Sequence, residues 1–380
     1  MFRVITFTIY VGLFIYSLGA RAEFGPDLSR DSISVMSYNV ENLFDSEHDE
    51  GKDDYTFLPK SFPGKMEACA KIRIPTFREL CEKTDWRPER VNLKVGQIKR
   101  VIEHQGFLPD IVGLSEVENE NVLNILARAT GYDHLYIADG NDSRGIDVAL
   151  MFNEQKIQYV SHKEIEVGFK DSGNMKTRNV LRVHFRLKDA SLRNAKDSAP
   201  VLAVYVSHWP SQSNPGKYRM AVAEIIKADI DKNVKEHGAS NYHVVVMGDL
   251  NTIESESPNG IDNVLASSKW TSRLYDTEVL ARGKGIKMTP PGTYYYKKNA
   301  TWNRLDRILV SKNMTSRGRI VADLKSFKNL AAPFMTYVYQ ERNGKSVSHV
   351  PRGYDFSAES ADKAGFSDHL PVFIRLNIAN

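Results

Sequence analysis

The chain has 380 residues, of which 42% are hydrophobic and 26% are charged, with 24 Gly and 15 Pro. This composition is typical of a globular protein and excludes collagen-like, low-complexity and wholly disordered chains. The formal net charge of +4, from 51 Lys and Arg against 47 Asp and Glu, is too small for a protein that binds a polyanion through bulk charge. A polyanionic partner must therefore be recognised at a local site.

Residues 1–22 have the form of a signal peptide. Arg3 gives a cationic start, residues 4–18 are uncharged and largely apolar, and residues 20–22 have the small-x-small pattern of a signal-peptidase site. The apolar run is shorter than the ~20 residues of a spanning helix, and no later segment is apolar for long enough to cross a bilayer. We expect residues 23–380 to be a single secreted or periplasmic domain, without a membrane span and monomeric.

Cys69 and Cys81 stand twelve positions apart. In the oxidising compartment that export implies, they are expected to form a disulfide, which contributes about 3 kcal/mol in the chain-entropy model. A metal site at these cysteines is disfavoured, because neither a C-x-x-C pair nor a neighbouring His accompanies them.

Residues 45–54 contain six acidic side chains and share the composition of a calcium-binding loop. The spacing differs, because Gly51 is the seventh residue from Asp45 and not the sixth, and Thr56 stands where the bidentate Glu belongs. We expect a solvated loop.

Short β-branched runs predict eight strands, at residues 32–38, 111–114, 147–152, 180–187, 201–206, 242–247, 307–310 and 372–376. A helix is predicted from Pro88 onward, with an apolar face at Val91, Val95, Ile98 and Ile102. A second apolar stripe runs through Met220, Ala223, Ile226, Ile230 and Val234. Residues 331–364 are expected to form a surface loop. Strands mixed with helices, without repeats or linkers, indicate one layered α/β sandwich.

Polar clusters stand at the ends of these predicted strands, where a rigid sheet holds side chains on short loops. They contribute Asn39, Glu41, Glu116, His208, Asp249, Asn251, Asp306, Asp368 and His369. Carboxylates suit Mg²⁺, which takes one or two protein carboxylates together with waters and phosphate oxygens. Imidazoles and a further carboxylate activate water or assist a leaving oxygen. The set predicts metal-assisted hydrolysis of a phosphoester.

Each member also has a structural explanation of its own. Asp249 and Asn251 suit an Asx-type turn after a buried strand, and His208 suits a packed loop histidine. The joint occurrence favours catalysis. Motifs for other chemistries, G-x-x-x-x-G-K-[ST], H-E-x-x-H and G-x-S-x-G, are absent from the sequence, and without a Cys/His cluster a zinc site is disfavoured.

Six motifs follow one another, at residues 37–44 (SYNVENLF), 113–117 (GLSEV), 207–210 (SHWP), 247–251 (MGDLN), 304–308 (RLDRI) and 367–371 (SDHLP). Together they resemble the endonuclease/exonuclease/phosphatase superfamily, on its pancreatic deoxyribonuclease-like side. The resemblance implies a four-layered α/β sandwich, in which two packed, mostly antiparallel sheets are flanked by helices and carry the site at one rim.

The resemblance also implies a metal site. Glu116 matches the principal metal-binding carboxylate, Asn39 is close to metal or phosphate, and Glu41 stands where some relatives use an acidic ligand. Asp368 is expected on the metal side. The implied cofactor is Mg²⁺, with Mn²⁺ and Ca²⁺ as alternatives.

The implied catalytic residues lie in the later motifs. Asp249 and Asn251 match the pair that handles the attacking water and the phosphoryl group, with Asn251 also a phosphate ligand. Asp306 is expected to orient His369, as an acidic partner fixes an imidazole tautomer. Relatives are argued to use either the Asp or the His as general base, and both stay open.

His208 matches the second catalytic histidine of the deoxyribonuclease-like branch, and Arg144 resembles its phosphate-contacting arginine. The segment 37–45 with its acidic insert, and residues 292–296 before Trp302, resemble exported bacterial nucleases. Residues 294–304 are rich in Tyr, Trp, Lys and Arg. This segment either contacts nucleic acid by stacking and charge or forms a hairpin whose tyrosines pack inward.

The resulting hypothesis is an exported, Mg²⁺-dependent phosphodiesterase, a nuclease that hydrolyses DNA with low sequence specificity, with RNA as a further candidate substrate. One alternative is an inositol-phosphate or sphingolipid phosphoesterase of the same fold. Another is a non-catalytic secreted binding module. Endonuclease and exonuclease action both remain open.

Overall fold

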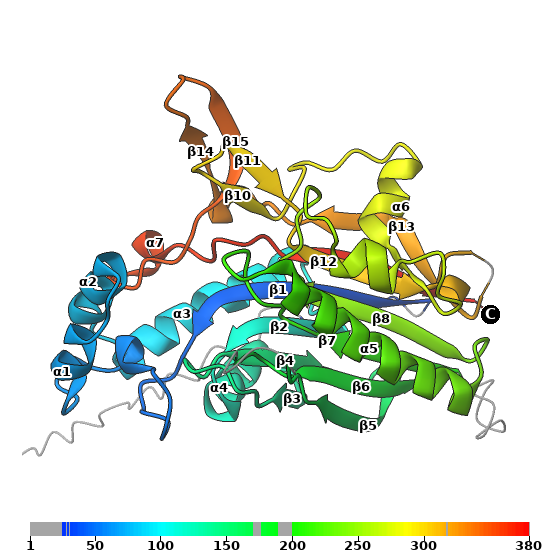
Figure 1. Ribbon diagram of the computed structural model, residues 1–380, viewed down its shortest axis with the longest axis horizontal. Helices are drawn as coiled ribbons and strands as arrows, with labels where there is room; N and C mark the ends of the chain where they lie inside the picture. Colours follow the sequence, from blue (N-terminus) through cyan, green and yellow to red (C-terminus); the bar gives the residue numbers. More distant parts are fainter. Residues whose placement is uncertain are drawn as a thin grey trace, which may run out of the picture.

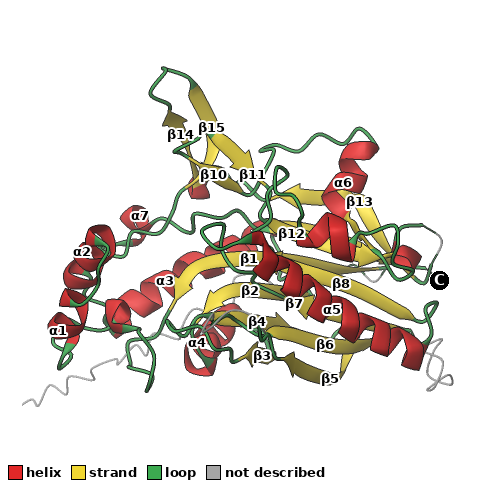
Figure 2. Ribbon diagram, viewed as in Figure 1, coloured by secondary structure: helices red, strands yellow, loops and turns green. Residues whose placement is uncertain are grey.

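The computed structural model describes residues 25–27, 29, 31–169, 176–188, 200–316 and 318–379. Two six-stranded sheets pack face to face, and helices cover their outer sides (Figure 1). Figure 2 separates these helical layers from the strands by colour. The predicted four-layered α/β sandwich is confirmed, whereas the signal peptide expected at residues 1–22 lies outside the described residues.

The first sheet has the strand order β13-β16-β1-β2-β4-β3. Its strands are β1 (Ser32–Leu43), β2 (Ile111–Val117), β3 (His134–Ala138), β4 (Asp147–Phe152), β13 (Ile320–Asn329) and β16 (Val372–Ile378). β1 and β2 run parallel, and the other neighbours in this sheet are antiparallel.

The second sheet has the order β5-β6-β7-β8-β12-β9. Its strands are β5 (Ile157–Ile165), β6 (Val180–Leu187), β7 (Val201–Val206), β8 (Tyr242–Asp249), β9 (Leu274–Asp276) and β12 (Asp306–Ser311). Here β7 and β8 are the parallel pair, and the other neighbours are antiparallel. Each sheet therefore has one parallel pair at its centre. All eight predicted strands are confirmed as parts of these sheets.

The helices are α1 (Lys65–Ala70), α2 (Pro75–Lys83), α3 (Pro88–Ile102), α4 (Glu120–Thr130), α5 (Gly216–His237), α6 (Thr277–Gly283) and α7 (Ala361–Ala364). Within the described ranges, none of them is both long and apolar enough to cross a membrane. Cys69 and Cys81, one in α1 and one in α2, are joined by a disulfide and are both buried.

Three hydrophobic clusters fill the three interfaces between the four layers. Alternate residues of a strand face opposite sides, so in β1 Val35 packs between the sheets while Met36 packs beneath the helices. In β8, Val245 lies between the sheets and Val246 faces α5. Each such fully buried side chain contributes about 1.5–3 kcal/mol relative to an exposed one. The central strands are thus held rigidly from both sides.

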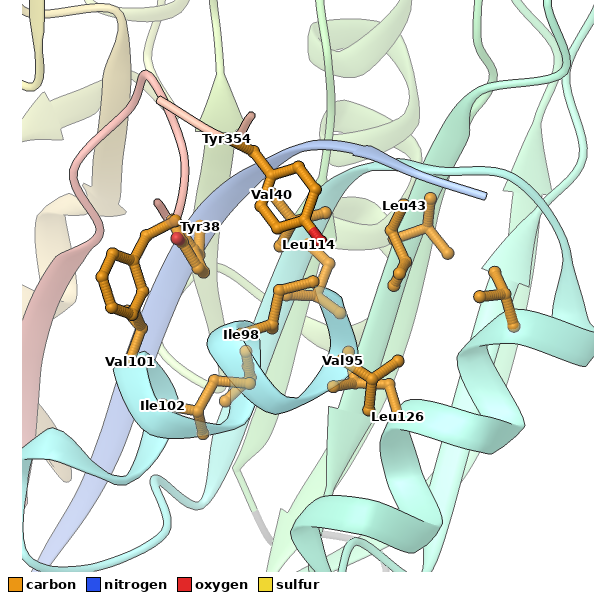
Figure 3. Packing of buried hydrophobic residues seen from close by; sticks show 14 of the residues in the cluster. Tyr38, Val40, Leu43, Val95, Ile98, Val101, Ile102, Leu114, Leu126 and Tyr354 are labelled. Atoms are coloured by element: carbon orange, nitrogen blue, oxygen red, sulfur yellow. The ribbon is translucent and has the colours of Figure 1, made fainter. Parts of the chain in front are cut away.

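Helix α3 covers the first sheet through the predicted apolar stripe. Its Val95 and Ile98 pack in one cluster with Tyr38 of β1 and Leu114 of β2 (Figure 3). The second stripe packs α5 on the second sheet, where Ala223, Ile226 and Ile230 are buried and Met220 and Val234 are partly buried. Both predicted helical faces are confirmed.

Two hairpins project from the sandwich on one side (Figure 1). One is formed by β10 (Tyr294–Tyr296) and β11 (Thr301–Asn303), the other by β14 (Thr336–Gln340) and β15 (Ser346–Pro351). The prediction of a surface loop over residues 331–364 is therefore wrong for this hairpin and for α7 at the end of the range. The second hairpin is ordered because Val347 and Val350 bury against Tyr295, with Trp302 alongside.

The acidic segment 45–54 is also less solvated than predicted. Asp45 and Asp54 are buried. Asp45 Oδ2 accepts hydrogen bonds from the side-chain amides of Asn119 at 3.1 Å and Asn121 at 2.8 Å. Asp54 is paired with His48. The contacts of Asp45 hold the segment onto the sandwich, and single-sequence patterns do not show them.

Candidate active site

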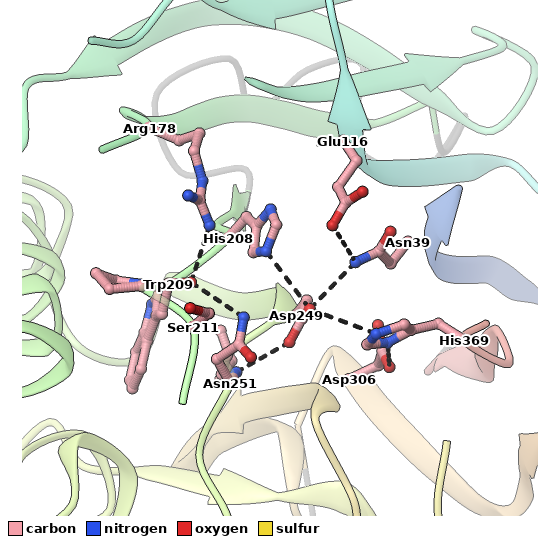
Figure 4. A network of polar contacts seen from close by, with 12 residues as sticks. Asn39, Glu116, Arg178, His208, Trp209, Ser211, Asp249, Asn251, Asp306 and His369 are labelled. Atoms are coloured by element: carbon pink, nitrogen blue, oxygen red, sulfur yellow. Dashed lines mark hydrogen bonds and ion pairs between the residues drawn. The ribbon is translucent and has the colours of Figure 1, made fainter. Parts of the chain in front are cut away.

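Candidate residues from both sheets converge at the rim where the parallel strand pairs end (Figure 4). β1 and β2 carry Asn39 and Glu116, while Asp249 ends β8 and His208 follows β7. Parallel neighbours end at the same edge of a sheet, so each pair presents two side chains together. Packing the sheets face to face then brings the two pairs into contact.

The carboxylate of Asp249 lies at the centre of this group. Its Oδ2 accepts a hydrogen bond from Asn39 Nδ2 at 3.1 Å and lies 3.5 Å from His208 Nε2 and 3.9 Å from His369 Nε2. Its Oδ1 accepts from the backbone N–H of Asn251 at 2.9 Å, the Asx-type contact expected from the sequence. Burial raises the pKa of Asp249 to about 7, although the nearby His369 opposes the rise.

His369 is held from its other side by Asp306. Nδ1 of the ring lies 2.8 Å from Asp306 Oδ2, and both residues are buried. An ionised carboxylate only accepts hydrogen bonds, so Nδ1 carries the proton and Nε2 faces Asp249. Burial disfavours the charged ring, but the carboxylates of Asp306 and Asp249 prevail and raise the pKa of His369 well above its usual value. The predicted orienting pair is thus in contact.

The backbone at several of these positions is left-handed. Glu41, Glu116 and Asn251 have φ values of 54°, 68° and 46°, a conformation that costs a non-glycine residue roughly 1–2 kcal/mol. Gly248 has φ 137°, and a Cβ there would lie 1.9 Å from the carbonyl oxygen of Ser207. Such strain concentrates at functional positions, and here it turns the chain sharply at the ends of the strands.

His208 lies beside an arginine that the sequence reasoning missed. Arg178 is buried, and its guanidinium donates to the carbonyl oxygen of Trp209 at 2.9 Å and to Asp142 Oδ2 at 3.1 Å. Asn251 Nδ2 donates to the same Trp209 oxygen at 3.1 Å. Burial, followed by the charge of Arg178, holds the pKa of His208 well below its usual value, so that the ring is neutral at neutral pH.

Arg144, the predicted phosphate contact, lies on the same side of the site. Its side chain is half exposed and pairs with Asp142 at 3.4 Å. Its charge is a further cause of the lowered pKa of His208. Two guanidinium groups, one buried and one half exposed, therefore flank this histidine. The signal for Arg178 in the sequence was its position two residues before the predicted strand 180–187.

The opposite side of the site is acidic. Glu116 accepts hydrogen bonds from Asn39 Nδ2 at 3.2 Å and from the backbone N–H of Asn42 at 3.0 Å. Glu41 accepts from the backbone N–H of Asp368 at 2.8 Å. Burial and the neighbouring Asp368 raise the pKa of Glu41 to about 8, and burial also raises the pKa of Asp368.

A second residue missed by the sequence reasoning is Lys94 of α3, on this acidic side. It is fully buried, and its Nζ donates to the carbonyl oxygen of Phe366 at 3.2 Å and lies 4.0 Å from the ring centre of Tyr354. Burial lowers the pKa of Lys94 to about 8, although Glu41 opposes the change. In the sequence, the feature that could have identified Lys94 as buried was its position three residues after Val91, on the apolar face of a predicted helix.

The donor set of the acidic side suits a hard cation. Glu116, Glu41 and Asp368 offer carboxylate oxygens, and Asn39 adds an amide oxygen. Among the residues that the structure describes, no three His, Cys, Asp or Glu side chains already converge on one cation position. Mg²⁺ needs no such cage, because it keeps several waters and takes one or two carboxylates. The residues therefore fit Mg²⁺ or a similar ion.

Comparison with known proteins gives the same fold. No curated protein matches the sequence significantly. An endonuclease/exonuclease/phosphatase family protein of Bacteroides thetaiotaomicron superposes with a TM-score of 0.53 at 16% identity, over 92% of this chain and 98% of that one. A mannosyl-6-phosphatase of the same organism gives 0.53 at 17% identity, over 91% and 99%. A humanised D. rerio TDP2 gives 0.50 at 15% identity, over 91% and 99%.

The sequence itself matches a family model described as the endonuclease/exonuclease/phosphatase family, over residues 76–378. This range covers most of the chain and includes both sheets except β1. Members of this superfamily are phosphoesterases, generally dependent on divalent metal ions. The chain belongs to the endonuclease/exonuclease/phosphatase family.

Proposed function

We propose that the protein is a divalent-metal-dependent phosphodiesterase that hydrolyses nucleic acid, DNA above all, with low sequence specificity. The observation that carries this proposal is the position of Asp249, whose Oδ2 faces Asn39, His208 and His369 at 3.1, 3.5 and 3.9 Å. An acceptor surrounded by one amide and two imidazoles suits a phosphodiester, because the acceptor takes a proton from water while the donors hold phosphoryl oxygens.

In the proposed reaction, water passes a proton to Asp249, or to His369 when its ring is neutral, as the water oxygen bonds to phosphorus. The bond from phosphorus to the 3′ oxygen breaks, and that oxygen takes a proton from solvent. Neutral His208 assists by donating a hydrogen bond through Nε2. Arg178 and Arg144 flank His208, where guanidinium groups bind phosphate oxygens.

Glu116 is the principal metal ligand in this proposal, with Asn39, Glu41 and Asp368 beside it. When bound, Mg²⁺ supplies stabilisation of the negative charge that develops on the phosphoryl group. Mn²⁺ and Ca²⁺ remain candidate ions.

The test is cleavage of supercoiled plasmid and end-labelled linear DNA with Mg²⁺, Mn²⁺, Ca²⁺ or EDTA. We expect cleavage with Mg²⁺, none with EDTA, and a loss of at least about 100-fold in Glu116→Gln. Glu67→Gln, an exposed carboxylate of α1, is the matched control and should cut like wild type. If pure protein leaves DNA and RNA intact under every ion tried, the nuclease proposal fails.

The same samples decide between the alternatives. Release of phosphate from inositol phosphates or sugar monophosphates, or of phosphocholine from sphingomyelin, without DNA cleavage, selects a different substrate on the same fold. The solved mannosyl-6-phosphatase of similar fold is the reason to include sugar phosphates. Equal activity of Glu116→Gln and wild type points to a contaminant and revives the non-catalytic binding module.

We also propose export to the periplasm or medium, after removal of residues 1–22. The disulfide between Cys69 and Cys81 supports an oxidising compartment. Amino-terminal sequencing of protein recovered from cell fractions tests this, and a mature chain that still begins at Met1 in the cytoplasm would contradict it.

A further inference from the structure

The two projecting hairpins form one unit, which we call the hairpin lobe, residues 294–303 and 336–352. Tyr295 packs against Val347 and Val350, and its hydroxyl donates to Glu341 Oε1 at 2.6 Å. Lys297 lies 5.7 Å from the ring centre of Tyr337. The first hairpin is thereby fixed to the second.

The hairpin lobe is continuous with the candidate active site. Tyr294 forms a β-bridge with His369, and their ring centres are 5.0 Å apart. Alternate residues of a strand project on the same face, so Tyr296 lies on the same face of β10 as Tyr294, which contacts His369. Tyr296 is 37% exposed. Tyr295 projects on the other face, into the lobe. The interpretation of a hairpin whose tyrosines pack inward thus holds for Tyr295, and the interpretation of nucleic-acid contact stays a prediction.

The charge of the hairpin lobe differs from that of the rest of the chain. It contains one acidic side chain, Glu341, and five basic ones, Lys297, Lys298, Arg342, Lys345 and Arg352. Its net formal charge of +4 equals that of the whole chain, so the charges outside it cancel. Lys298, Arg342 and Lys345 are exposed, and among the described residues none of them has a carboxylate within 4.0 Å, although the charge of Lys345 helps to lower the pKa of Glu341. They are free to meet an anion.

The tip of the second hairpin argues against a lipid surface as the partner. Residues 340–346 are all polar, charged or glycine, so nothing at the tip inserts into a bilayer. The apolar side chain that the hairpin does expose, Val338 at 58%, lies within β14 and away from the tip. Positive charge combined with exposed tyrosine, beside a phosphoester site, is the pattern of a surface that binds single-stranded nucleic acid.

We propose that the hairpin lobe binds a single-stranded stretch of nucleic acid beyond the scissile phosphate, with Tyr296 stacking on a base and Lys298, Arg342 and Lys345 contacting phosphates. This inference rests on the proposed function and adds to it the part of the substrate that lies outside the catalytic residues. Each cation that contacts a phosphate releases counterions, so the affinity depends on salt.

The test uses the full chain in EDTA, with a short fluorescein-labelled single-stranded DNA oligonucleotide and fluorescence anisotropy. The triple variant Lys298→Glu, Arg342→Glu, Lys345→Glu should bind at least about tenfold more weakly than wild type. The logarithm of its association constant should also depend less steeply on the logarithm of the salt concentration, with a slope smaller in magnitude by about 2. Tyr296→Ala should weaken binding by about 5- to 100-fold with little change in this slope.

Matched controls separate these effects from bulk charge and lost aromatic surface. Arg73→Glu, Lys232→Glu, Lys269→Glu changes the net charge equally at three exposed positions outside the lobe, and Phe77→Ala removes an aromatic side chain that is 58% exposed in α2. Both controls should bind like wild type. Thermal unfolding confirms that each variant is folded.

Bis(para-nitrophenyl) phosphate is a diester too small to reach the hairpin lobe. Its hydrolysis therefore distinguishes a failure of the proposed function from a failure of the lobe inference. If wild type cleaves DNA and the lobe variants bind it as tightly as wild type, the lobe inference is overturned while the proposed function stands. If wild type hydrolyses only the small diester, nucleic acid is not the substrate and both fail. Binding to phosphatidylglycerol vesicles without binding to the oligonucleotide overturns the lobe inference in favour of a membrane.

Discussion

His369 and Asp306 are closely coupled, because Nδ1 and Oδ2 are 2.8 Å apart and both residues are buried. Asp306→Asn and His369→Asn should each lower kcat by about 10²–10⁴-fold, since each breaks the oriented imidazole. The double variant should lose about as much as the more damaged single variant, because residues that act as one unit are not additive. The kcat of each variant is measured with bis(para-nitrophenyl) phosphate. A loss of kcat in the double variant equal to the product of the two single losses would contradict the coupling.

Gly248 permits the close approach of β7 and β8 that places His208 beside Asp249. Gly248→Ala should lower the free energy of unfolding by about 2 kcal/mol or more, because the new Cβ meets the Ser207 carbonyl in a strained backbone. Gly283→Ala in α6 has no atom within 4 Å of the new Cβ and should stay within about 0.5 kcal/mol. Urea unfolding compares the two, and equal stabilities would count against this role for Gly248.

The site residues that sequence could predict are those adjoining a strand-like run. Asp249 and Glu116 end such runs, so their convergence followed from the predicted sheets. Arg178 and Lys94 were missed, because their place depends on what packs around them. Lys94 looks like a surface lysine until the structure shows α3 burying it beneath Tyr354.

The predicted strands are the central strands of both sheets, and the four edge strands β3, β5, β9 and β13 were missed. Central strands are buried on both faces and read as continuous apolar runs. In an edge strand such as β5 only the first and last residues, Ile157 and Ile165, are buried, and β13 is interrupted by a register shift between Asp323 and Lys328. Their strand character comes from pairing with a neighbour, which local patterns do not reveal.

The layer between the second sheet and α5 contains a buried polar network. His184 of β6 is 5% exposed, and its Nε2 lies 3.0 Å from the hydroxyl of Tyr242, which in turn contacts Tyr205. Burial, followed by the charge of Arg182, lowers the pKa of His184 to about 3. The folded state therefore keeps this ring neutral where the unfolded chain, with a pKa near 6.5, binds a proton.

When a group has a lower pKa in the folded state than in the unfolded chain, the protein loses stability as the pH falls below the pKa of that group in the unfolded chain. Between pH 7 and pH 5, His184 should contribute about 2 kcal/mol of acid destabilisation. His184→Gln should remove this pH-dependent part, whereas His134→Gln, at an exposed ring, should not. Urea unfolding at both pH values measures it. Equal pH dependence of His184→Gln and wild type would show that the ring is not kept neutral.

Taken over the whole molecule, the fold and the metal site are separable. Three hydrophobic clusters connect the four layers, and the proposed metal ligands Glu116, Asn39, Glu41 and Asp368 lie at the rim and not between layers. The near-neutral total charge conceals a similar separation, because the acidic side of the candidate site adjoins a basic hairpin lobe. Folding should therefore proceed without the metal, while catalysis should not.

Removing the metal tests this separation. EDTA should abolish DNA cleavage while the protein stays folded, because no layer of the core depends on the ion. Adding Mg²⁺ at about 100 times its Kd should then raise the free energy of unfolding by about 2.7 kcal/mol, since an ion that binds only the folded state stabilises it by mass action. Glu116→Gln should lose most of this gain and Glu67→Gln should keep it. Thermal unfolding with and without Mg²⁺ is the measurement, and an equal gain in Glu116→Gln would place the ion elsewhere. Unfolding by EDTA alone would show instead that the ion holds the layers together.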